Sequence, residues 1–307
     1  MKKTVSLLLA LIFVFTLTSA IGVDAVAASN YSAYIEKSYS ASKNDIEIIG
    51  ADYTEAKGAK VQIDDNFFGK QVLVWKNEAG SVTYTFSSAE DANYCFKLFY
   101  GTVKGSGSDI RLGLKIDGKY PFSEAEELSF KRCFENSGDV RSDKWGNQFA
   151  PEQQERFGIF SGYAEDSLGR ESEPFEFSIS EGEHTLQIIS IDEPFAIEKI
   201  VFEAPKTAVS YSDYISALAG KAAFDGKEIV IQGENADYKS ASYLVPLSDM
   251  SEKSIISFEG RENNGVTETI NYIGSTNWQS QGDMLTFKVN VEKEALYKLS
   301  FKYRQKY

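Results

Sequence analysis

The residues with the chemistry of a binding site lie in a polar, aromatic segment and on two predicted strands before it. Within that segment an indole ring and two side-chain amides occur between positions Trp145 and Gln148. A flat aromatic ring stacks on the C–H face of a pyranose, while amide and guanidinium groups hydrogen-bond to its hydroxyls. The candidate binding residues are Tyr100, Arg111, Trp145, Asn147 and Gln148. The open alternative is that Trp145 anchors the segment to the fold and the amides cap it.

Catalytic chemistry has little support in the sequence. The chain has one histidine, His184, so a Ser-His-Asp triad or a Cys-His dyad could occur at most once, and no motif signals either. Two glutamate pairs could in principle serve a glycosidase, Glu152 with Glu155 and Glu171 with Glu173. They lie in predicted polar loops, where nothing would tune a carboxylate for acid catalysis. We therefore expect no enzyme activity and place His184 in a surface turn.

The composition excludes nucleic acid as a partner and indicates no cofactor. A formal net charge of −13 repels phosphate backbones, so we exclude nucleic acid as a partner. The run Asp64-Asp65-Asn66 resembles part of a calcium loop but lacks its glycine and distal glutamate, so we predict a polar turn. Two cysteines, Cys95 and Cys133, could form a disulfide in an oxidising compartment, and two separately buried thiols are the alternative.

The N-terminus predicts export. Two lysines precede an apolar run from Val5 to Leu17, and Ala25-Val26-Ala27 forms a small-residue cleavage site. We therefore predict a signal peptide over residues 1–27, with an uncleaved anchor as the alternative. The expected location is extracellular: secreted and associated with the cell surface.

The chain repeats itself. The run Tyr31-Ser32-Ala33-Tyr34-Ile35 returns as Tyr211-Ser212-Asp213-Tyr214-Ile215, and Trp75 returns as Trp278. The matched tryptophans predict one packing role shared by two cores. Because the repeated pattern stops at Tyr307, long before the first copy has ended, we expect an incomplete second copy in a fragment of a longer protein. A genuine short second domain is the alternative.

Strand patterns dominate the first copy. Apolar residues alternate with polar ones in several runs between Val82 and Phe202, and Asp117-Gly118 is typical of a tight turn between strands. Helical spacing at Tyr31 and Tyr34, and again at Tyr211 and Ile215, predicts a short helix before each copy. The segment from Phe122 to Arg170 breaks the alternation and is interpreted as a long irregular insertion. The sequence thus predicts an all-β, two-sheet jelly-roll sandwich with an incomplete second copy.

The closing strands of the first copy support a family resemblance. The runs Gly182 to Ile188 and Ile197 to Phe202 resemble those of galactose-binding-like jelly rolls, the sandwiches of many carbohydrate-binding modules. The stretch from Ile116 to Phe122, with Gly146, Asn147 and Pro151, looks like the N-terminal region of large Gram-positive extracellular solute-binding proteins. In those proteins such sandwiches precede a two-lobed sugar-transport domain, which does not follow in this sequence. The resemblance also implies that a structural calcium is possible, with Glu47 and Asp192 placed to bind it.

These observations divide the chain into a signal peptide (1–27), a first sandwich with its leading helix (28–205) and a partial second sandwich with its helix (206–307). The expected function is a secreted, non-catalytic carbohydrate-binding module from the N-terminal part of a solute-binding protein linked to sugar ABC transport. The expected partners are a carbohydrate and, through a missing C-terminal region, membrane transport components. Two alternatives remain open: a structural or protein-interaction sandwich, and an accessory module of a glycoside hydrolase.

Overall fold

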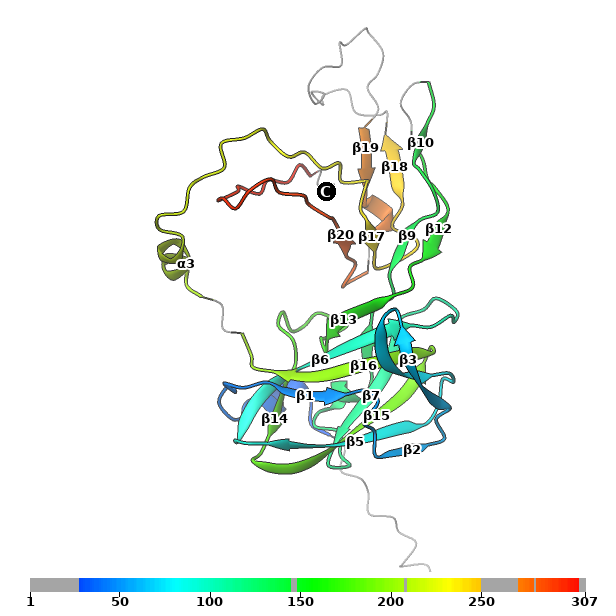
Figure 1. Ribbon diagram of the computed structural model, residues 1–307, viewed down its shortest axis with the longest axis vertical. Helices are drawn as coiled ribbons and strands as arrows, with labels where there is room; N and C mark the ends of the chain where they lie inside the picture. The colour runs from blue at the N-terminus through cyan, green and yellow to red at the C-terminus, as the bar shows by residue number, and fades with distance from the viewer. Residues whose placement is uncertain (1–27, 145–147, 207–208, 250–269, 279, 304–307) are drawn as a thin grey trace, which may run out of the picture.

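Two antiparallel sheets pack face to face in the computed structural model (Figure 1). The structure describes residues 28–144, 148–206, 209–249, 270–278 and 280–303. The helices are α2 (Tyr31–Ile35) and α3 (Tyr211–Ala217), with short 3₁₀ turns η1 (Ser123–Glu126) and η2 (Ser275–Asn277). The strands of the sandwich are β1 (Ile46–Ile49), β2 (Glu55–Lys57), β3 (Val61–Phe67), β4 (Lys70–Trp75), β5 (Ser81–Ser88), β6 (Ala92–Thr102), β7 (Ile110–Ile116), β8 (Leu128–Phe130), β13 (Ile159–Tyr163), β14 (Glu176–Ile179), β15 (Gly182–Asp192) and β16 (Phe195–Glu203). This architecture confirms the predicted all-β sandwich.

The seven-stranded sheet follows the order β13-β6-β16-β4-β3, with β1 on β16 and β14 on β6. Its central strand β6 alternates as the sequence predicts: Tyr94, Phe96 and Leu98 are fully buried, whereas Lys97 and Phe99 are partly exposed on the outer face. Since successive side chains of a strand point to opposite faces, one face of this sheet builds the core and the other meets solvent.

The five-stranded sheet, ordered β2-β5-β15-β7-β8, closes the core from the other side. The core between the sheets is rich in aromatic rings, as in the edge-on contact of Phe96 with Phe202 at 5.6 Å. Trp75 is fully buried and stacks on Phe195 at 5.4 Å, which confirms its predicted place in the core. Asp117 and Gly118 both have positive φ, as the predicted two-residue turn requires.

Helix α2 is held against the sandwich by its two tyrosines. The ring of Tyr31 packs on Phe175 at 4.6 Å, and its hydroxyl accepts a hydrogen bond from the Glu176 backbone at 3.0 Å. The hydroxyl of Tyr34 accepts one from the Ser178 backbone at 2.7 Å. A helix of five residues has little stability of its own, so these contacts fix its position.

The segment from Phe122 to Arg170 is not irregular, and that interpretation was wrong. It contributes β8 to the five-stranded sheet and β13 to the seven-stranded sheet. Between them lie the short strands β9 (Phe134–Asn136), β10 (Arg141–Ser142), β11 (Gln148–Phe149) and β12 (Gln153–Glu155). Strands this short carry almost no alternation, because two or three residues do not define a period.

The second copy does not reproduce the first. Helix α3 forms as predicted, but the repeated run Ile229 to Gly233 has no strand, and Trp278 is 42 % exposed instead of buried. Its described strands are β17 (Tyr238–Lys239), β18 (Pro246–Asp249), β19 (Ile270–Ile273) and β20 (Leu285–Thr286), and β17 pairs with β9. An apolar pattern forms a strand where partner strands and a second sheet exist to bury it, and the described residues 209–249, 270–278 and 280–303 do not supply them.

The state of the two cysteines can be compared with the described residues. Cys95 and Cys133 are free, separately buried thiols, as the alternative to a disulfide required, and burial raises the pKa of the Cys95 thiol to about 11 and of the Cys133 thiol to about 12. No helix in the described ranges is long and apolar enough to cross a membrane.

Candidate functional site

Of the five predicted binding residues, Tyr100, Arg111 and Gln148 lie in the described part of the chain. Tyr100 is 3 % exposed, and its hydroxyl donates a hydrogen bond to the Lys131 carbonyl at 2.6 Å. Burial raises the pKa of its phenol above the ordinary value, so the group stays protonated as that donor. The ring therefore packs in the core and presents no face to a ligand. Trp145 and Asn147 lie outside the described residues, and Gln148 pairs with Ser142 in the short hairpin β10–β11.

Arg111 lies on β7 and is occupied by two carboxylates. Its guanidinium binds Asp192 at 2.7 Å and Glu127 at 2.8 Å. These hydrogen bonds, with the one that Arg111 donates to Asp192 as the largest cause, raise the pKa of Arg111 above its usual value. The calcium expectation is not met either: Asp192 pairs with Arg111, whereas Glu47 pairs with Lys199 at 2.6 Å on the other sheet. The described part of the chain has no cluster of three metal-ligating acidic, histidine or cysteine side chains.

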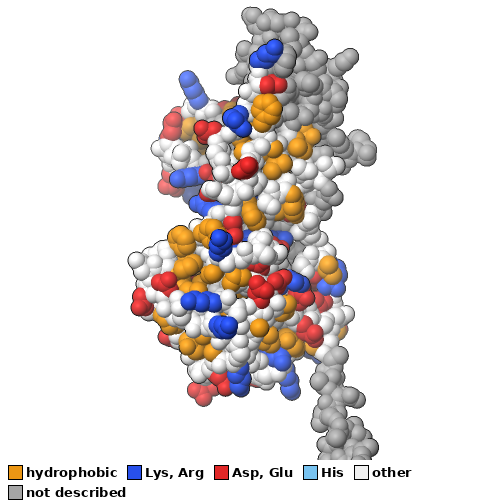
Figure 2. All heavy atoms as spheres, turned by 90° about the vertical axis from the view of Figure 1, so that its right-hand side faces the viewer, with side chains coloured by type: hydrophobic (Ala, Val, Ile, Leu, Met, Phe, Trp, Pro, Cys, Tyr) orange, Lys and Arg blue, Asp and Glu red, His pale blue; other side chains and the backbone are white. Residues whose placement is uncertain are grey.

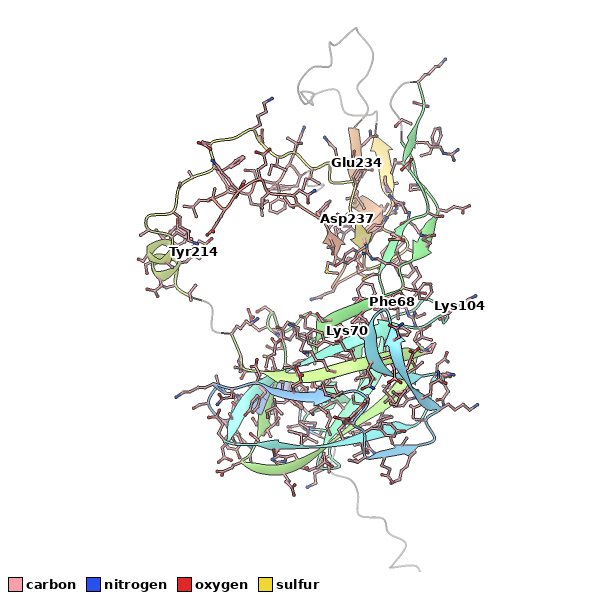
Figure 3. The ribbon with its side chains drawn as sticks, in the orientation of Figure 1. Phe68, Lys70, Lys104, Tyr214, Glu234 and Asp237 are labelled. Carbon is pink, nitrogen blue, oxygen red and sulfur yellow. The ribbon has the colours of Figure 1, made fainter. Side chains whose placement is uncertain are left out.

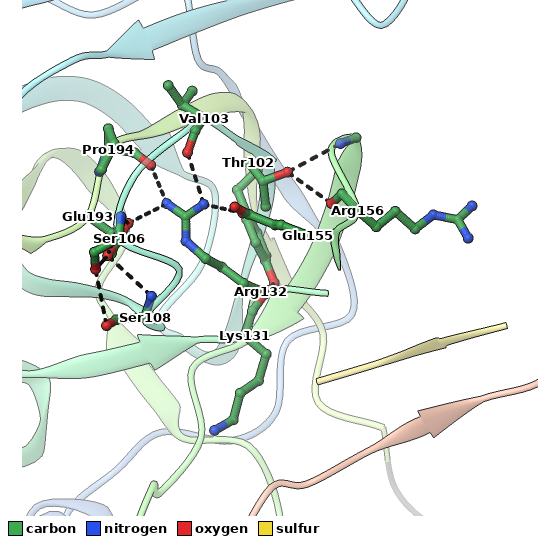
Figure 4. Close-up of polar contacts among 12 residues, drawn as sticks. Thr102, Val103, Ser106, Ser108, Lys131, Arg132, Glu155, Arg156, Glu193 and Pro194 are labelled. Atoms are coloured by element: carbon green, nitrogen blue, oxygen red, sulfur yellow. Dashed lines mark hydrogen bonds and ion pairs between the residues drawn. The ribbon is translucent and has the colours of Figure 1, made fainter. Parts of the chain in front are cut away.

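A buried ionic network fixes the loops at one end of the sandwich (Figure 4). Arg132 and Glu193 are both fully buried and pair at 2.8 Å. The guanidinium also donates to Glu155 and to the carbonyls of Val103 and Pro194, the latter two at 2.9 Å. A buried charge is tolerated when it is paired and hydrogen-bonded. The network thus ties the β6–β7 loop, the β15–β16 turn and the inserted segment together.

Glu193 also organises the glycine-rich loop after β6. Its carboxylate accepts hydrogen bonds from the backbone of Ser106 at 3.0 Å and of Ser108 at 3.2 Å. A Cβ on Gly105 would lie 2.0 Å from a carboxylate oxygen of Glu193, so glycine is required for this close approach. Sequence reasoning missed this network, because nothing in the local sequence pairs Arg132 with a glutamate 61 positions away.

The outer face of the seven-stranded sheet carries a cluster that we call the outer-face platform: Lys97, Phe99, Tyr163, Lys199 and Glu203. The ammonium groups of Lys97 and Lys199 lie 5.4 and 5.0 Å from the centre of the Phe99 ring. Neighbouring strands hold these residues in register, with Lys199 opposite Phe99 and Tyr163 opposite Lys97. A site built on paired strands is positioned more accurately than one built on loops.

Hydrogen bonds fix the polar part of the platform. Lys97 Nζ donates to Glu203 at 2.9 Å and to the Tyr163 hydroxyl at 3.2 Å, and that hydroxyl donates to Glu203 at 2.5 Å. Burial is the largest single effect on the pKa of Lys97 and of Glu203, and in each case it disfavours the charged form. The hydrogen bonds outweigh it, so the pKa of Lys97 is raised and that of Glu203 is lowered. Both groups are therefore charged at neutral pH.

Phe68 lies at the tip of the β3–β4 hairpin, near Lys70 (Figure 3). Its backbone has φ of 49°, a left-handed conformation that is unusual for a bulky residue, and its side chain is 59 % exposed. Phe67, the preceding residue, lies over Gly101 and joins the apolar cluster on the outer face. Lys70 pairs with Glu198 at 3.0 Å, next to Lys199, so the hairpin tip and the platform border the same stretch of β16.

Two of the four carboxylates considered for catalysis, Glu155 and Glu171, have structural partners. Glu155 accepts from the buried Arg132, and Glu171 accepts from the Ser32 hydroxyl at 3.4 Å. The acidic run Asp64 to Asn66 belongs to strand β3, where the register shifts, and not to a turn as predicted. On the face shown in Figure 2, basic, acidic and hydrophobic side chains are interspersed, so that face has no one-signed patch for a polyanion.

His184 is not a surface turn residue, and that prediction was wrong. It lies in β15 and is 9 % exposed. Its Nδ1 is 2.7 Å from an Asp117 carboxylate oxygen, and its Nε2 is 2.9 Å from the Ser180 carbonyl. Burial opposes the charged imidazolium and is the largest effect, yet these two acceptors together raise the pKa of His184 above its usual value. The run Glu181-Gly182-Glu183 has the composition of a turn, but β15 already begins at Gly182, which explains the mistaken assignment.

The chain is structurally similar to several solved structures, with low sequence identity to each. No protein-family model and no curated protein matches the chain. A GH26-CBM35 β-(1,4)-mannanase from Podospora anserina is 14 % identical with a TM-score of 0.35, over 55 % of this chain and 29 % of the mannanase. The C-terminal CBM6 of the laminarinase LamC from Zobellia galactanivorans is 17 % identical with a TM-score of 0.31, over 52 % of this chain and 98 % of that module.

A family 35 carbohydrate-binding module from Clostridium thermocellum is 10 % identical with a TM-score of 0.28, over 52 % of this chain and 99 % of the module. The shared region is thus about half of this chain and nearly the whole of two isolated modules. Identities and TM-scores this low transfer no ligand and no activity to this chain, so its function has to be inferred from its own surface.

Proposed function

We propose that residues 28–205 form an exported, non-catalytic sandwich that binds carbohydrate on the outer-face platform and Phe68. The observation that carries this proposal is Phe68: a bulky ring held in a left-handed turn conformation and 59 % exposed. Such a conformation costs about 1–2 kcal/mol, and strained residues cluster where a side chain has a task outside the fold. The same chain closes another two-residue turn with Asp117-Gly118, a pair that tolerates this backbone.

The surrounding groups suit a polyhydroxylated ligand. The rings of Phe68 and Phe99 offer apolar faces for the C–H side of a sugar. Lys199 and Lys70 supply donors for hydroxyl oxygens, and Glu203 supplies an acceptor. Since each of these charges is already paired with a neighbouring side chain (Glu47, Glu198 and Lys97), the surface is preorganised and a ligand need not order it. We expect modest affinity, because an open sheet face buries less of a ligand than a closed pocket does.

The substitution Phe68→Asn tests the proposal. Affinity for soluble β-glucan, β-mannan or β-galactan, measured by electrophoresis in polysaccharide gels and by calorimetry, should fall at least tenfold, which is about 1.4 kcal/mol. The fold should survive, because Asn-Gly is the preferred pair for this turn. Relief of the positive φ, about 1–2 kcal/mol, would offset the lost edge-on contact with Phe67, whose ring centre lies 5.0 Å away.

Leu168→Ala is the matched control, since Leu168 is 70 % exposed and belongs to neither the platform nor the hairpin. It should change neither binding nor stability. Unchanged binding in Phe68→Asn would overturn the assignment of the site. Failure of the wild-type chain to bind any of these glycans at millimolar concentration would favour the structural or protein-interaction alternative.

The larger context is a separate proposal that rests on the sequence resemblance. We place the sandwich in an extracellular solute-binding protein for sugar uptake, with an accessory module of a glycoside hydrolase as the alternative. Genomic DNA around the coding region distinguishes them. A two-lobed binding domain in the same reading frame supports uptake, and a hydrolase domain supports the alternative.

A further inference from the structure

A pocket of about 410 Å³ opens at the end of the sandwich opposite the network around Arg132. One of its walls is Ile179, which pairs with Ala92 at the start of β6. The network contacts the loop that follows the other end of β6, at Thr102. A strand of 11 residues puts these two ends about 35 Å apart. We call this cavity the far-end pocket, and its volume is in the range of small-molecule sites.

One wall of the pocket is a rigid ion pair. His184 faces the Asp117 carboxylate and the Ser180 carbonyl, which are both acceptors, so both ring nitrogens carry hydrogens. Asp117 is held in turn by the backbone of Thr185, whose nitrogen donates at 2.9 Å. The imidazole therefore has no free nitrogen for acid–base work. Its part is to orient Asp117, whose side chain is 52 % exposed at the pocket.

Tyr34, Lys37 and Tyr39 form another part of the pocket lining. The Tyr34 hydroxyl accepts a hydrogen bond from the Ser178 backbone and also lies within hydrogen-bonding reach of the Ser178 side chain. Burial raises the pKa of that phenol, so the hydrogen stays on it. Tyr39 is 42 % exposed, while its backbone nitrogen is anchored on Asn93 Oδ1 at 3.1 Å. Lys37, exposed in the same part of the lining, makes no ion pair within the described ranges.

We propose that the far-end pocket binds a single pyranose at the end of a glycan chain, as a second site distinct from the outer-face platform. The Tyr39 ring supplies the stacking face, Tyr34 and Lys37 supply donors, and Asp117 supplies the acceptor. The pocket is partly open to solvent, so it can enclose one ring at the end of a chain, whereas a flat sheet face contacts the middle of a chain. The inference rests on the proposed function of the sandwich and adds a consequence: one molecule can bridge two glycan chains.

The test uses the full chain and calorimetric titration with cellotriose, mannotriose and β-1,3-galactotriose. The wild-type protein should bind two molecules of the preferred trisaccharide. Tyr39→Ala should weaken one site at least tenfold and leave the other unchanged, while Phe68→Asn does the converse. The wild-type protein should also precipitate the matching soluble polysaccharide by cross-linking, and neither variant should. Tyr39 makes no side-chain hydrogen bond among the described residues, so its removal should leave the unfolding temperature unchanged, as in the control Leu168→Ala.

The outcomes separate the two proposals. One site per chain that Phe68→Asn removes and Tyr39→Ala leaves intact overturns the far-end pocket and keeps the platform. One site that Tyr39→Ala removes and Phe68→Asn leaves intact keeps the pocket and overturns the platform. No binding of any trisaccharide by the wild-type protein overturns both.

Discussion

Replacement of Glu193 by glutamine should destabilise the sandwich strongly, although it removes no heavy-atom volume. Glu193 and Arg132 are both fully buried, and their charged groups are 2.8 Å apart. At an effective dielectric constant of about 20, this separation corresponds to an attraction of about 6 kcal/mol. Glutamine keeps one acceptor oxygen for the guanidinium but offers an N–H₂ group where the backbone of Ser106 donates. Removal of one partner of a buried pair costs about 3–5 kcal/mol, and we expect a loss in that range.

The assay is equilibrium unfolding in urea, followed by the fluorescence of the buried Trp75. The matched control is Glu127→Gln, since Glu127 also lies 2.8 Å from an arginine, Arg111, but both side chains are about half exposed. Water screens such a pair, so its removal should leave the unfolding midpoint where it is. If Glu193→Gln changes the free energy of unfolding by less than about 1 kcal/mol, or if both variants behave alike, the reasoning from burial is wrong.

Three further predictions concern stability. Trp75→Ala should lower the free energy of unfolding by about 3–5 kcal/mol because Trp75 is fully buried. Trp278→Ala should lower it far less because Trp278 is 42 % exposed. Urea unfolding of both variants measures the two free energies. The pKa of His184 is raised in the folded protein, so the protonated imidazole stabilises the fold. This stabilisation is complete below the unfolded pKa of about 6.5 and is lost as the pH rises through the folded pKa. The unfolding temperature of the wild type should therefore fall across that pH window, whereas that of His184→Gln should not. Burial lowers the pKa of Lys239 to about 8. Between pH 8 and about 10.5 the Lys239 amine is protonated in the unfolded chain but neutral in the folded one, so the free energy of unfolding should rise with pH in this range. A free energy of unfolding that stays constant over this range, or the same rise in Lys239→Met, would contradict this.

The strands were predictable where the alternation of apolar and polar residues extends over many positions. The alternation in β6 and β15, each 11 residues long, identified the strands and their buried faces. The Tyr-Ser-x-Tyr-Ile motif predicted both helices. The prediction failed between Phe122 and Arg170, because strands of two to five residues are defined by their partners and not by their own pattern.

The candidate site was predictable only in kind. The sequence pointed to aromatic rings and polar groups, but it chose Tyr100, which faces the core, instead of its neighbour Phe99, which faces outward. In a run where both alternating sets are aromatic, either one could be the buried set. Phe68 carried one sequence signal, a following glycine, but without the structure nothing marked its ring as exposed.

What the sequence by itself determined is the content of the first sandwich: which strands form, that their core is aromatic, and that tight turns such as Asp117-Gly118 join them. These properties follow from local periodicity and turn chemistry, which act over a few residues. Tertiary structure alone decided which face of β6 meets solvent, that Arg132 and Glu193 share one buried site, and that Trp278, unlike its counterpart Trp75, is exposed. Each of these depends on partners distant in the chain, because burial and charge pairing are properties of the assembled sheets and not of any one segment.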